Sequence, residues 1–427
     1  SSSAASHASN HARAAARAWF DPRFAADEDA RAAMDPPADL ERWLRSEAGD
    51  AVLRRIAFEA WRAAPIHAET AEDMAANRVR AGGKTSPYTV KEVGEKPESG
   101  WALVIAMHGG GRASKEFNDG QWEHMQRYYR EQPQAGGYLY VALRAPTDEW
   151  NGFYTGYVYP LIEQLIAQFI IHRDVDPQRV YAIGYSHGGY GAYAIGPKLP
   201  DRFAAVHASA AAATDGEIAP ETLLNLRFTA MIGELDTAFG RVERNRRFRE
   251  RIEQLRAEHG RGGFPVRVIE IAGNGHTGLP DRDWLTEMLP HDRTAPPEEL
   301  WWHQSCGVVR HHYWLADDAA RKGRVVRARR AGNRIDLDVR ETDRVELRLD
   351  ARLVDLTRPV RVRQGERERV LEAVPSLRTL AGTLLERRDP SLAATVVLQV
   401  PVGVAATPES ATPESATPES GADAAEG

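Results

Sequence analysis

The chemically richest stretch of the chain is residues 180–190, V-Y-A-I-G-Y-S-H-G-G-Y. Strand-forming residues lead into Gly184-Tyr185-Ser186-His187-Gly188, and a helix-compatible segment follows. This order predicts a nucleophile elbow, a strained strand-to-helix turn that exposes a serine hydroxyl. The residues two positions before and after the serine must be small, and both are glycine. Ser186 is therefore the predicted nucleophile, and the alternative is an ordinary turn, since glycine and serine are common turn residues.

A serine nucleophile needs a base to take its proton and usually a carboxylate to orient that base. In chains with this type of elbow the acid and then the histidine follow the serine. Asp236 lies at the end of a predicted strand over 227–232, and His276 lies in a glycine-rich turn after the next strand, 266–271. The carboxyl ends of parallel strands meet at one sheet edge, so both should lie near Ser186.

Other residues could fill these two roles. Asp215 is the alternative acid because it follows an earlier strand-like segment, and Glu234 lies two residues before Asp236. His207 lies inside a predicted strand, where a core histidine with satisfied hydrogen bonds is the better interpretation. Other downstream histidines are His259, expected in solvent at the end of a charged helix, His303, and the pair His311 and His312, expected on a strand surface.

Negative charge on a substrate carbonyl oxygen needs fixed hydrogen-bond donors. An apolar strand over 101–107 ends in His108-Gly109-Gly110-Gly111. Glycine lets backbone N–H groups approach a ligand without a Cβ in the way. The amides of Gly109, Gly110 and His187 are the predicted oxyanion hole, and the alternative is a merely flexible loop.

Aromatic residues follow the next strand of the pattern. Trp150, Phe153 and Tyr154, with Tyr157 and Tyr159 beyond them, could line the acyl or alcohol pocket of a substrate. Packing of several of these rings against the next helix is the alternative.

Alternating strand and helix patterns through the middle of the chain predict an α/β fold, a three-layer sandwich with a mostly parallel sheet. The expected division is a disordered segment over 1–17, a helical accessory region over 18–80, the α/β domain over 81–295, a small antiparallel β-domain over 296–402 and a disordered tail over 403–427. Period-two alternation of apolar and charged residues indicates the β-domain. A threefold Ala-Thr-Pro-Glu-Ser repeat at 406–420 indicates the tail. The β-domain could serve structure, dimerisation or substrate binding.

Composition excludes several classes of protein. A formal net charge of −6 over 427 residues argues against a nucleic-acid partner. No apolar run is long enough to span a membrane. The single cysteine, Cys306, rules out an internal disulfide and a cysteine-based metal site. Neither a metal nor a cofactor is expected. The start without methionine and the proline-bearing tail favour an exported (periplasmic or extracellular) protein, with the cytoplasm as the alternative. Oligomeric state stays open.

The motifs together resemble a known group of proteins. The glycine loop, the elbow, Gly233–Asp236 and Gly275-His276 are similar to those of α/β-hydrolases of the polyhydroxybutyrate depolymerase-like and feruloyl-esterase-like group, which is related to prolyl-oligopeptidase-type domains. The likeness covers about residues 88–290 and includes the segments 174–181 and 199–206. Asn118-Asp119 with Trp122, and Trp150 to Tyr154, are more particularly similar to planctomycete-type hydrolases.

The resemblance and the residues imply a serine hydrolase that cleaves small-molecule or polymeric carboxylic esters through an acyl-serine. A prolyl-oligopeptidase-type peptidase and a non-catalytic binding protein on the same scaffold are the two alternatives. The identity of the substrate is not encoded in these motifs.

Overall fold

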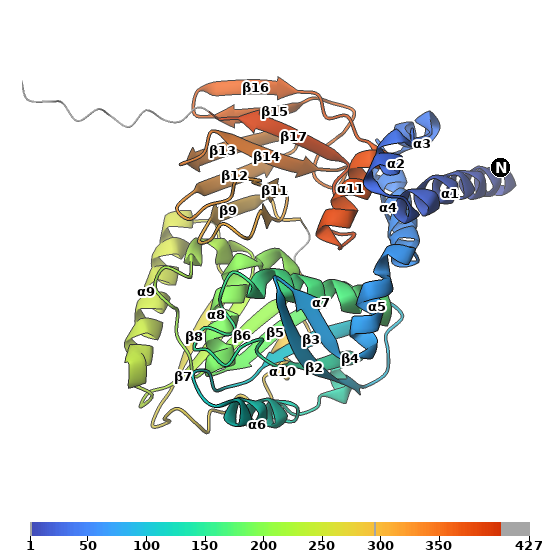
Figure 1. The fold of residues 1–427 in the computed structure, drawn as a ribbon. Coiled ribbons are helices and arrows are strands. Elements are labelled where there is room, and N and C mark those ends of the chain that lie inside the picture. Colours follow the sequence, from blue (N-terminus) through green and yellow to red (C-terminus); the bar gives the residue numbers. More distant parts are fainter. Residues whose placement is uncertain (1, 294–295, 403–427) are drawn as a thin grey trace, which may run out of the picture.

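The computed structural model describes residues 2–293 and 296–402. Its centre is an eight-stranded sheet in the order β1-β2-β4-β3-β5-β6-β7-β8 (Figure 1). β2 is antiparallel to both of its neighbours, and the strands from β4 to β8 are parallel. The strands are β1 (Arg78–Ala81), β2 (Lys84–Val93), β3 (Trp101–Met107), β4 (Tyr138–Leu143), β5 (Val175–Tyr185), β6 (Ala205–Ser209), β7 (Arg227–Gly233) and β8 (Val266–Ile271).

Helices cover both faces of this sheet. Side chains alternate between the faces of a strand, so Leu103 and Ile105 of β3 enter one core while Ala102 and Val104 enter another. The first core contains α7 (Val158–Arg173), α8 (His187–Lys198) and α9 (Arg241–His259), and the second contains residues of α6 (Lys115–Met125) and α10 (Leu285–Met288). These three layers and the strand order are those of the α/β-hydrolase fold, which confirms the predicted fold class.

The N-terminal region corrects one expectation. Residues 1–17 are predicted to be disordered, but α1 (Ser2–Ala25) is a helix whose later turns bury Trp19, Phe20 and Phe24. These rings join the first core, and α1 packs along α4. A polar alanine-rich start can be helical when large apolar residues anchor its far end. The other helices here are α2 (Glu28–Ala33), α3 (Ala38–Trp43), α4 (Glu47–Arg62) and α5 (Ala68–Ala75).

The C-terminal strands form two sheets around one core, not a single antiparallel sheet. One sheet contains β10 (His311–His312), β11 (Leu315–Ala316), β14 (Arg344–Leu349) and β17 (Val396–Pro401). The other contains β9 (Glu299–His303), β12 (Val325–Ala331), β13 (Arg334–Arg340), β15 (Val360–Gln364) and β16 (Arg367–Leu371). β13 and β15 pair in parallel, which corrects the purely antiparallel prediction. The predicted disordered tail lies outside the described residues.

One helix of the C-terminal region leaves the sandwich. α11 (Leu377–Arg387), capped by Ser376, buries Leu380 and Leu384 in the first core and packs against α4. Figure 1 shows α11 beside the N-terminal helices, at the junction of sandwich and sheet. Helices from the N-terminal and the C-terminal regions of the chain therefore meet in one place.

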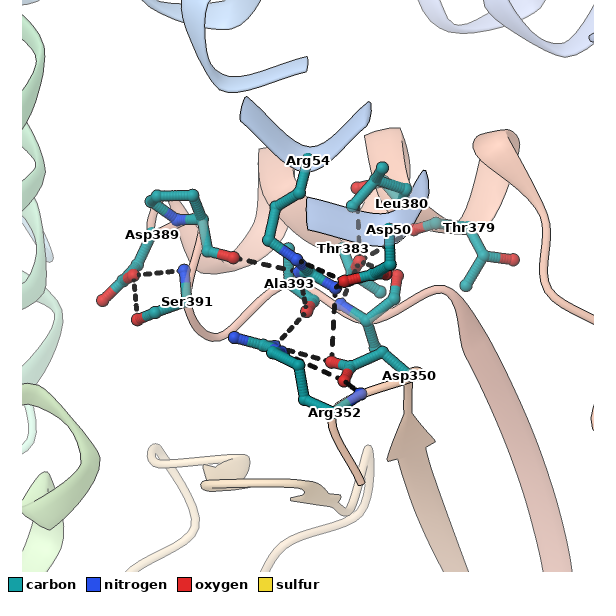
Figure 2. A network of polar contacts seen from close by, with 12 residues as sticks. Asp50, Arg54, Asp350, Arg352, Thr379, Leu380, Thr383, Asp389, Ser391 and Ala393 are labelled. Carbon is teal, nitrogen blue, oxygen red and sulfur yellow. Dashed lines mark hydrogen bonds and ion pairs between the residues drawn. The ribbon is translucent and has the colours of Figure 1, made fainter. Parts of the chain in front are cut away.

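A buried polar network joins the same three regions (Figure 2). Arg54 of α4 donates to Asp50 and to the carbonyl oxygens of Pro390 and Ala393, and its Nη2 lies 3.3 Å from Asp350. Arg352 donates to both carboxylate oxygens of Asp350. Buried charges persist only when each has partners, so this network fixes how α4, α11 and the sandwich sit together.

Candidate active site

Ser186 occupies the sharp turn between β5 and α8. Its φ of 54° and ψ of −113° are a strained conformation for a residue with a side chain. Its N–H donates to the carbonyl oxygen of Ser209, 2.8 Å away. A Cβ on Gly188 would lie 2.1 Å from the carbonyl oxygen of Met107, and one on Gly184 would lie 2.1 Å from that of Gly188. Only glycine fits at these two positions, as expected of an elbow.

The structure brings Ser186, His276 and Asp236 together. Ser186 Oγ lies 3.0 Å from Nε2 of His276, and Nδ1 of His276 lies 2.8 Å from Oδ2 of Asp236. Asp236 is 3% exposed, whereas the side chain of His276 is 37% exposed. A buried carboxylate that accepts from Nδ1–H leaves Nε2 as the acceptor for the serine proton.

Two loops that carry these residues are tied to each other and to the elbow. The Leu235 N–H donates to the carbonyl oxygen of Asn274, and the Tyr185 hydroxyl donates to the carbonyl oxygen of His276 over 2.6 Å. A Cβ on Gly233 would lie 2.3 Å from the carbonyl oxygens of both Asn274 and Gly275, so β7 must end in glycine for the loops to approach.

The alternative acids lie elsewhere. Asp215 is exposed, and Glu234 is exposed with its carboxylate accepting from the Gly273 N–H. His207 is fully buried between the hydroxyls of Thr229 and Ser209, as expected of a satisfied core histidine.

Two histidine expectations are wrong. His259 is not in solvent, because its side chain is only 6% exposed beside Glu299. His312 is not on a surface, because it is buried and stacks on Trp302 at 5.9 Å between ring centroids.

Arg241 is a site residue that sequence reasoning missed. Its guanidinium donates from Nε to Oδ2 of Asp236 over 2.9 Å and from Nη2 to Oδ1. Both side chains are buried, and the pair spans the turn between β7 and α9. The many charged residues of 241–261 predict a solvated amphipathic helix, which gives Arg241 no special role. A basic residue five positions after the acid, at the first residue of a helix, was the available signal.

The glycine loop after β3 is held at both ends. Nδ1 of His108 lies 2.6 Å from the carbonyl oxygen of Gly109. Nε2 of His108 accepts from the Ala145 N–H. Burial lowers the pKa of His108 to about 3, so the ring is neutral with its proton on Nδ1. Oδ1 of Asn118 accepts from the Gly111 N–H. The loop is thus anchored, not merely flexible.

The predicted oxyanion donors lie beside the serine. A Cβ on Gly109 would be 3.6 Å from the Cβ of Ser186, and Gly110 has a φ of 112°. Within the described residues the amides of Gly109, Gly110 and His187 donate no hydrogen bond. His187 itself is buried, and burial lowers its pKa to about 4. Its neutral ring packs between Phe153 and Trp150.

Two pockets open on either side of the glycine loop. The first, about 480 Å³, adjoins Gly111 and is lined by Arg112, Trp150, Tyr190, Thr214, Phe239 and Arg244. The second, about 580 Å³, adjoins Gly109 and includes Gln121, His124, Tyr128, Tyr185 and Thr277. Both are large enough for a substituent of a small ester.

The aromatic residues predicted to bind substrate divide between pocket and core. Trp150 is 38% exposed and lines the first pocket. Phe153 is wholly buried and packs on His108 and His187, while Tyr154 is 7% exposed. The prediction is therefore corrected for Phe153 and Tyr154, whose rings are buried in the core. Phe239 and Tyr190 take their places in the pocket wall.

Residues 2–293 and 296–402 contain no cluster of three or more His, Cys, Asp or Glu side chains placed to hold a metal ion. None of their helices combines the length and apolar character that a membrane crossing requires.

Comparison with known proteins gives structural likeness alone. No protein-family model matches the chain, and no curated protein matches it in sequence. Solved structures that it resembles include a thermostable esterase (20% identity, TM-score 0.38, 51% of this chain and 64% of that one). Another is a poly(3-hydroxybutyrate) depolymerase from Bordetella parapertussis (17% identity, TM-score 0.36, 48% of this chain and 88% of that one). A third is an acetyl xylan esterase from Aspergillus awamori (14% identity, TM-score 0.35, 48% of this chain and 94% of that one). The fold assignment rests on this chain's own strand order and elbow.

Proposed function

We propose that the protein hydrolyses carboxylic esters through a covalent acyl-serine. The observation that carries the proposal is the unbroken line of contacts from Ser186 Oγ through His276 to Asp236, built on a strained elbow. Strain of this kind persists where the surrounding structure is selected to hold it.

The reaction follows from this geometry in two halves. Ser186 Oγ attacks the ester carbonyl carbon while its proton passes to Nε2 of His276. The resulting imidazolium donates that proton to the departing alcohol as the carbon–oxygen bond breaks. Water then attacks the acyl-serine, giving a proton to His276, and the acid leaves as Ser186 regains its hydrogen. Asp236 keeps the imidazole oriented throughout.

The tetrahedral intermediate carries its negative charge on the former carbonyl oxygen. The free amides of Gly109, Gly110 and His187 are our candidates to hold that oxygen. Loss of one such donor costs about 3–4 kcal/mol of transition-state stabilisation in a serine protease. Because these donors belong to the backbone, no side-chain substitution removes them directly.

Esters are favoured over amides because an alcohol leaving group needs less protonation than an amine. The C-terminal domain supports this choice, since within the described residues it is a two-sheet sandwich and not a propeller that would enclose a peptide. A peptidase remains the rival reaction, and a digest of a peptide library separates the two.

Ser186→Ala tests the proposal directly. We expect hydrolysis of p-nitrophenyl acetate to fall by about 10⁴-fold or more, as for other triad serines. The variant should also lose labelling by a fluorophosphonate probe. Ser99→Ala, at an exposed turn, is the matched control and should retain both. A Ser186→Ala protein as active as the wild type would refute the mechanism.

A further inference from the structure

The first pocket, beside Gly111, is lined by exposed aromatic rings together with arginine side chains. Trp150 and Phe239 are 38% and 70% exposed, and their ring centroids lie 5.6 Å apart. Tyr190, from the first turn of α8, stands 5.1 Å from Trp150. Large aromatic surfaces left in water are unfavourable unless a ligand covers them. Tyr190 lies four residues after Ser186 and Phe239 three residues after Asp236, so a substrate of the same site can cover these rings.

The same pocket contains two arginines and no carboxylate. Arg244 of α9 lies over Tyr190, and its Nε donates to the carbonyl oxygen of Ala213 over 3.0 Å. These contacts fix the guanidinium at the pocket wall. Among the described residues, no carboxylate lies within ion-pair distance of it. Most other arginines of α9, including Arg241, Arg246 and Arg251, do pair with acids.

Arg112 also lines this pocket. It follows Gly111 directly, is exposed and has a φ of 45°, a left-handed conformation that costs energy for a side-chain-bearing residue. The described part of the chain offers it no hydrogen-bond or ion-pair partner. Neither guanidinium has a carboxylate partner among the described residues, so an anion bound in the pocket that both line would supply one.

The other pocket indicates which half of the ester meets the arginines. It includes Thr277 and Gly278, the two residues after His276. In the proposed reaction the alcohol must take its proton from His276, so it departs on the side of the histidine loop. The acyl group then extends the other way, past Gly111 and toward Trp150.

We propose that the enzyme selects esters whose acid portion carries an aromatic ring and, beyond it, a carboxylate. The ring lies against Trp150 and Phe239, and the carboxylate lies between Arg112 and Arg244. This inference rests on the proposed esterase function and adds the class of acid that the site accepts.

The test compares two p-nitrophenyl esters with the same alcohol. One acid is 3-phenylpropanoic acid and the other is its 4-carboxy derivative. We expect wild-type kcat/KM to be about tenfold higher for the charged ester at low salt, the scale of a charge-assisted hydrogen bond. The preference should shrink as sodium chloride is raised, because salt screens exposed charges.

Arg112→Gln and Arg244→Gln should each reduce the ratio of the two kcat/KM values, and Arg112→Lys should retain part of it. The ratio cancels any effect of a substitution on folding or on the triad. Arg247→Gln is the matched control, because Arg247 is an exposed arginine of α9 outside the pocket, and it should leave the ratio unchanged.

Three results would overturn the inference: equal or lower activity on the charged ester, a preference that both arginine variants keep, or a preference found only when the carboxylate is moved to the alcohol. In each case fast hydrolysis of the neutral ester that depends on Ser186 would leave the esterase proposal standing. Loss of that dependence would instead remove both.

Discussion

Arg241 holds both carboxylate oxygens of Asp236, one of which also faces His276. Desolvation by burial lowers the pKa of Arg241, but its bonds with Asp236 and Tyr190 outweigh that effect and raise the pKa above its usual value. Arg241 therefore stays charged, and the fork of its guanidinium fixes the plane of the carboxylate. In the proposed reaction Arg241 is a positioning residue, since it reaches the reacting atoms only through Asp236.

Replacing Arg241 tests this role. For Arg241→Gln we expect kcat to fall about tenfold with little change in KM, because the carboxylate loses its fixed orientation while the pockets persist. Arg241→Lys should recover little, since an ammonium cannot bind both oxygens at once. Arg246→Gln, which breaks an exposed pair with Glu270 on the same helix, should leave kcat unchanged. Wild-type kcat in Arg241→Gln would contradict the assignment.

Truncation of Trp150 should change substrate binding, whereas truncation of Phe153 should change stability. Trp150→Ala removes an exposed pocket wall, so we expect KM for aromatic esters to rise about fivefold with stability nearly intact. Phe153→Ala empties a buried site under His187 and should lower the free energy of unfolding by about 3–5 kcal/mol. Urea unfolding beside steady-state kinetics measures both. Equal destabilisation by the two variants would be the contrary result.

Buried neutral histidines predict acid sensitivity. Burial lowers the pKa of His207 to about 3 and that of His312 to about 4, as for His108 and His187. The unfolded chain takes up these protons near pH 6.5, before the folded protein can. Stability is therefore full above pH 6.5 and falls as the pH drops toward 4, by about 1.4 kcal/mol per pH unit for each histidine.

Urea unfolding at pH 7.5, 6.5, 5.5 and 4.5 measures this slope. His207→Gln removes one of the titrating groups, so its stability should depend less steeply on pH than that of the wild type. His124→Gln, which removes a histidine outside the buried set, is the control. An unchanged slope in His207→Gln would show that the ring does not contribute.

Two glycines should give opposite outcomes when replaced by alanine. In Gly188→Ala the new Cβ meets the carbonyl oxygen of Met107 at 2.1 Å, so β3 and the elbow must separate and activity should be lost with stability. In Gly382→Ala, within α11, the Cβ has nothing within 4 Å and should stabilise the helix by about 0.5–1 kcal/mol. Thermal unfolding and ester hydrolysis of the two variants check this pair.

Arg387 should be among the costliest side chains to remove. It is buried and donates to Asp201, which also accepts from the Tyr313 N–H. Burial raises the pKa of Asp201, but Arg387 and Arg202 outweigh it and hold the pKa below its usual range. Arg387→Met leaves a buried carboxylate short of a partner, and we expect a loss of about 3–5 kcal/mol.

The double variant Arg387→Met with Asp201→Asn should recover part of that loss, because the unpaired charge is gone. Arg378→Met, which breaks a surface pair with the exposed Asp35, should change the free energy of unfolding by no more than about 1 kcal/mol. A mild effect of Arg387→Met in denaturant titrations would show that water or another cation reaches Asp201.

The sequence predicted the sheet and the three central residues because each is a local signal at a strand end. Ser186, Asp236 and His276 all follow apolar runs, and the fold places such ends together. Arg241 and Phe239 carry no such signal, since their roles depend on a loop that returns to the pocket. Phe153 and Trp150 look alike in sequence, and only the path of their loop decides which ring is buried.

The C-terminal region was harder to predict for a related reason. β16 is exposed along nearly its whole length, so it lacks the alternation that identifies a half-buried strand. The parallel pairing of β13 with β15 depends on how the chain crosses between the two strands, and the spacing of apolar residues does not show that path. The helix at 377–387 could be recognised, but its apolar face gave no indication that its partner would be α4, more than 300 residues earlier.

The contacts of Arg54 also constrain the order in which the chain can fold during its synthesis. Its acceptor at Pro390 lies 336 positions further along the chain. A ribosome therefore releases α4 long before the carbonyl groups of Pro390 and Ala393, which accept from Arg54, exist. The N-terminal helices therefore lack their C-terminal packing partners until nearly the whole described chain has been synthesised. A chain shortened before α11 would leave exposed the surface of α4 that α11 covers, so the packing of α11 on α4 comes late in folding.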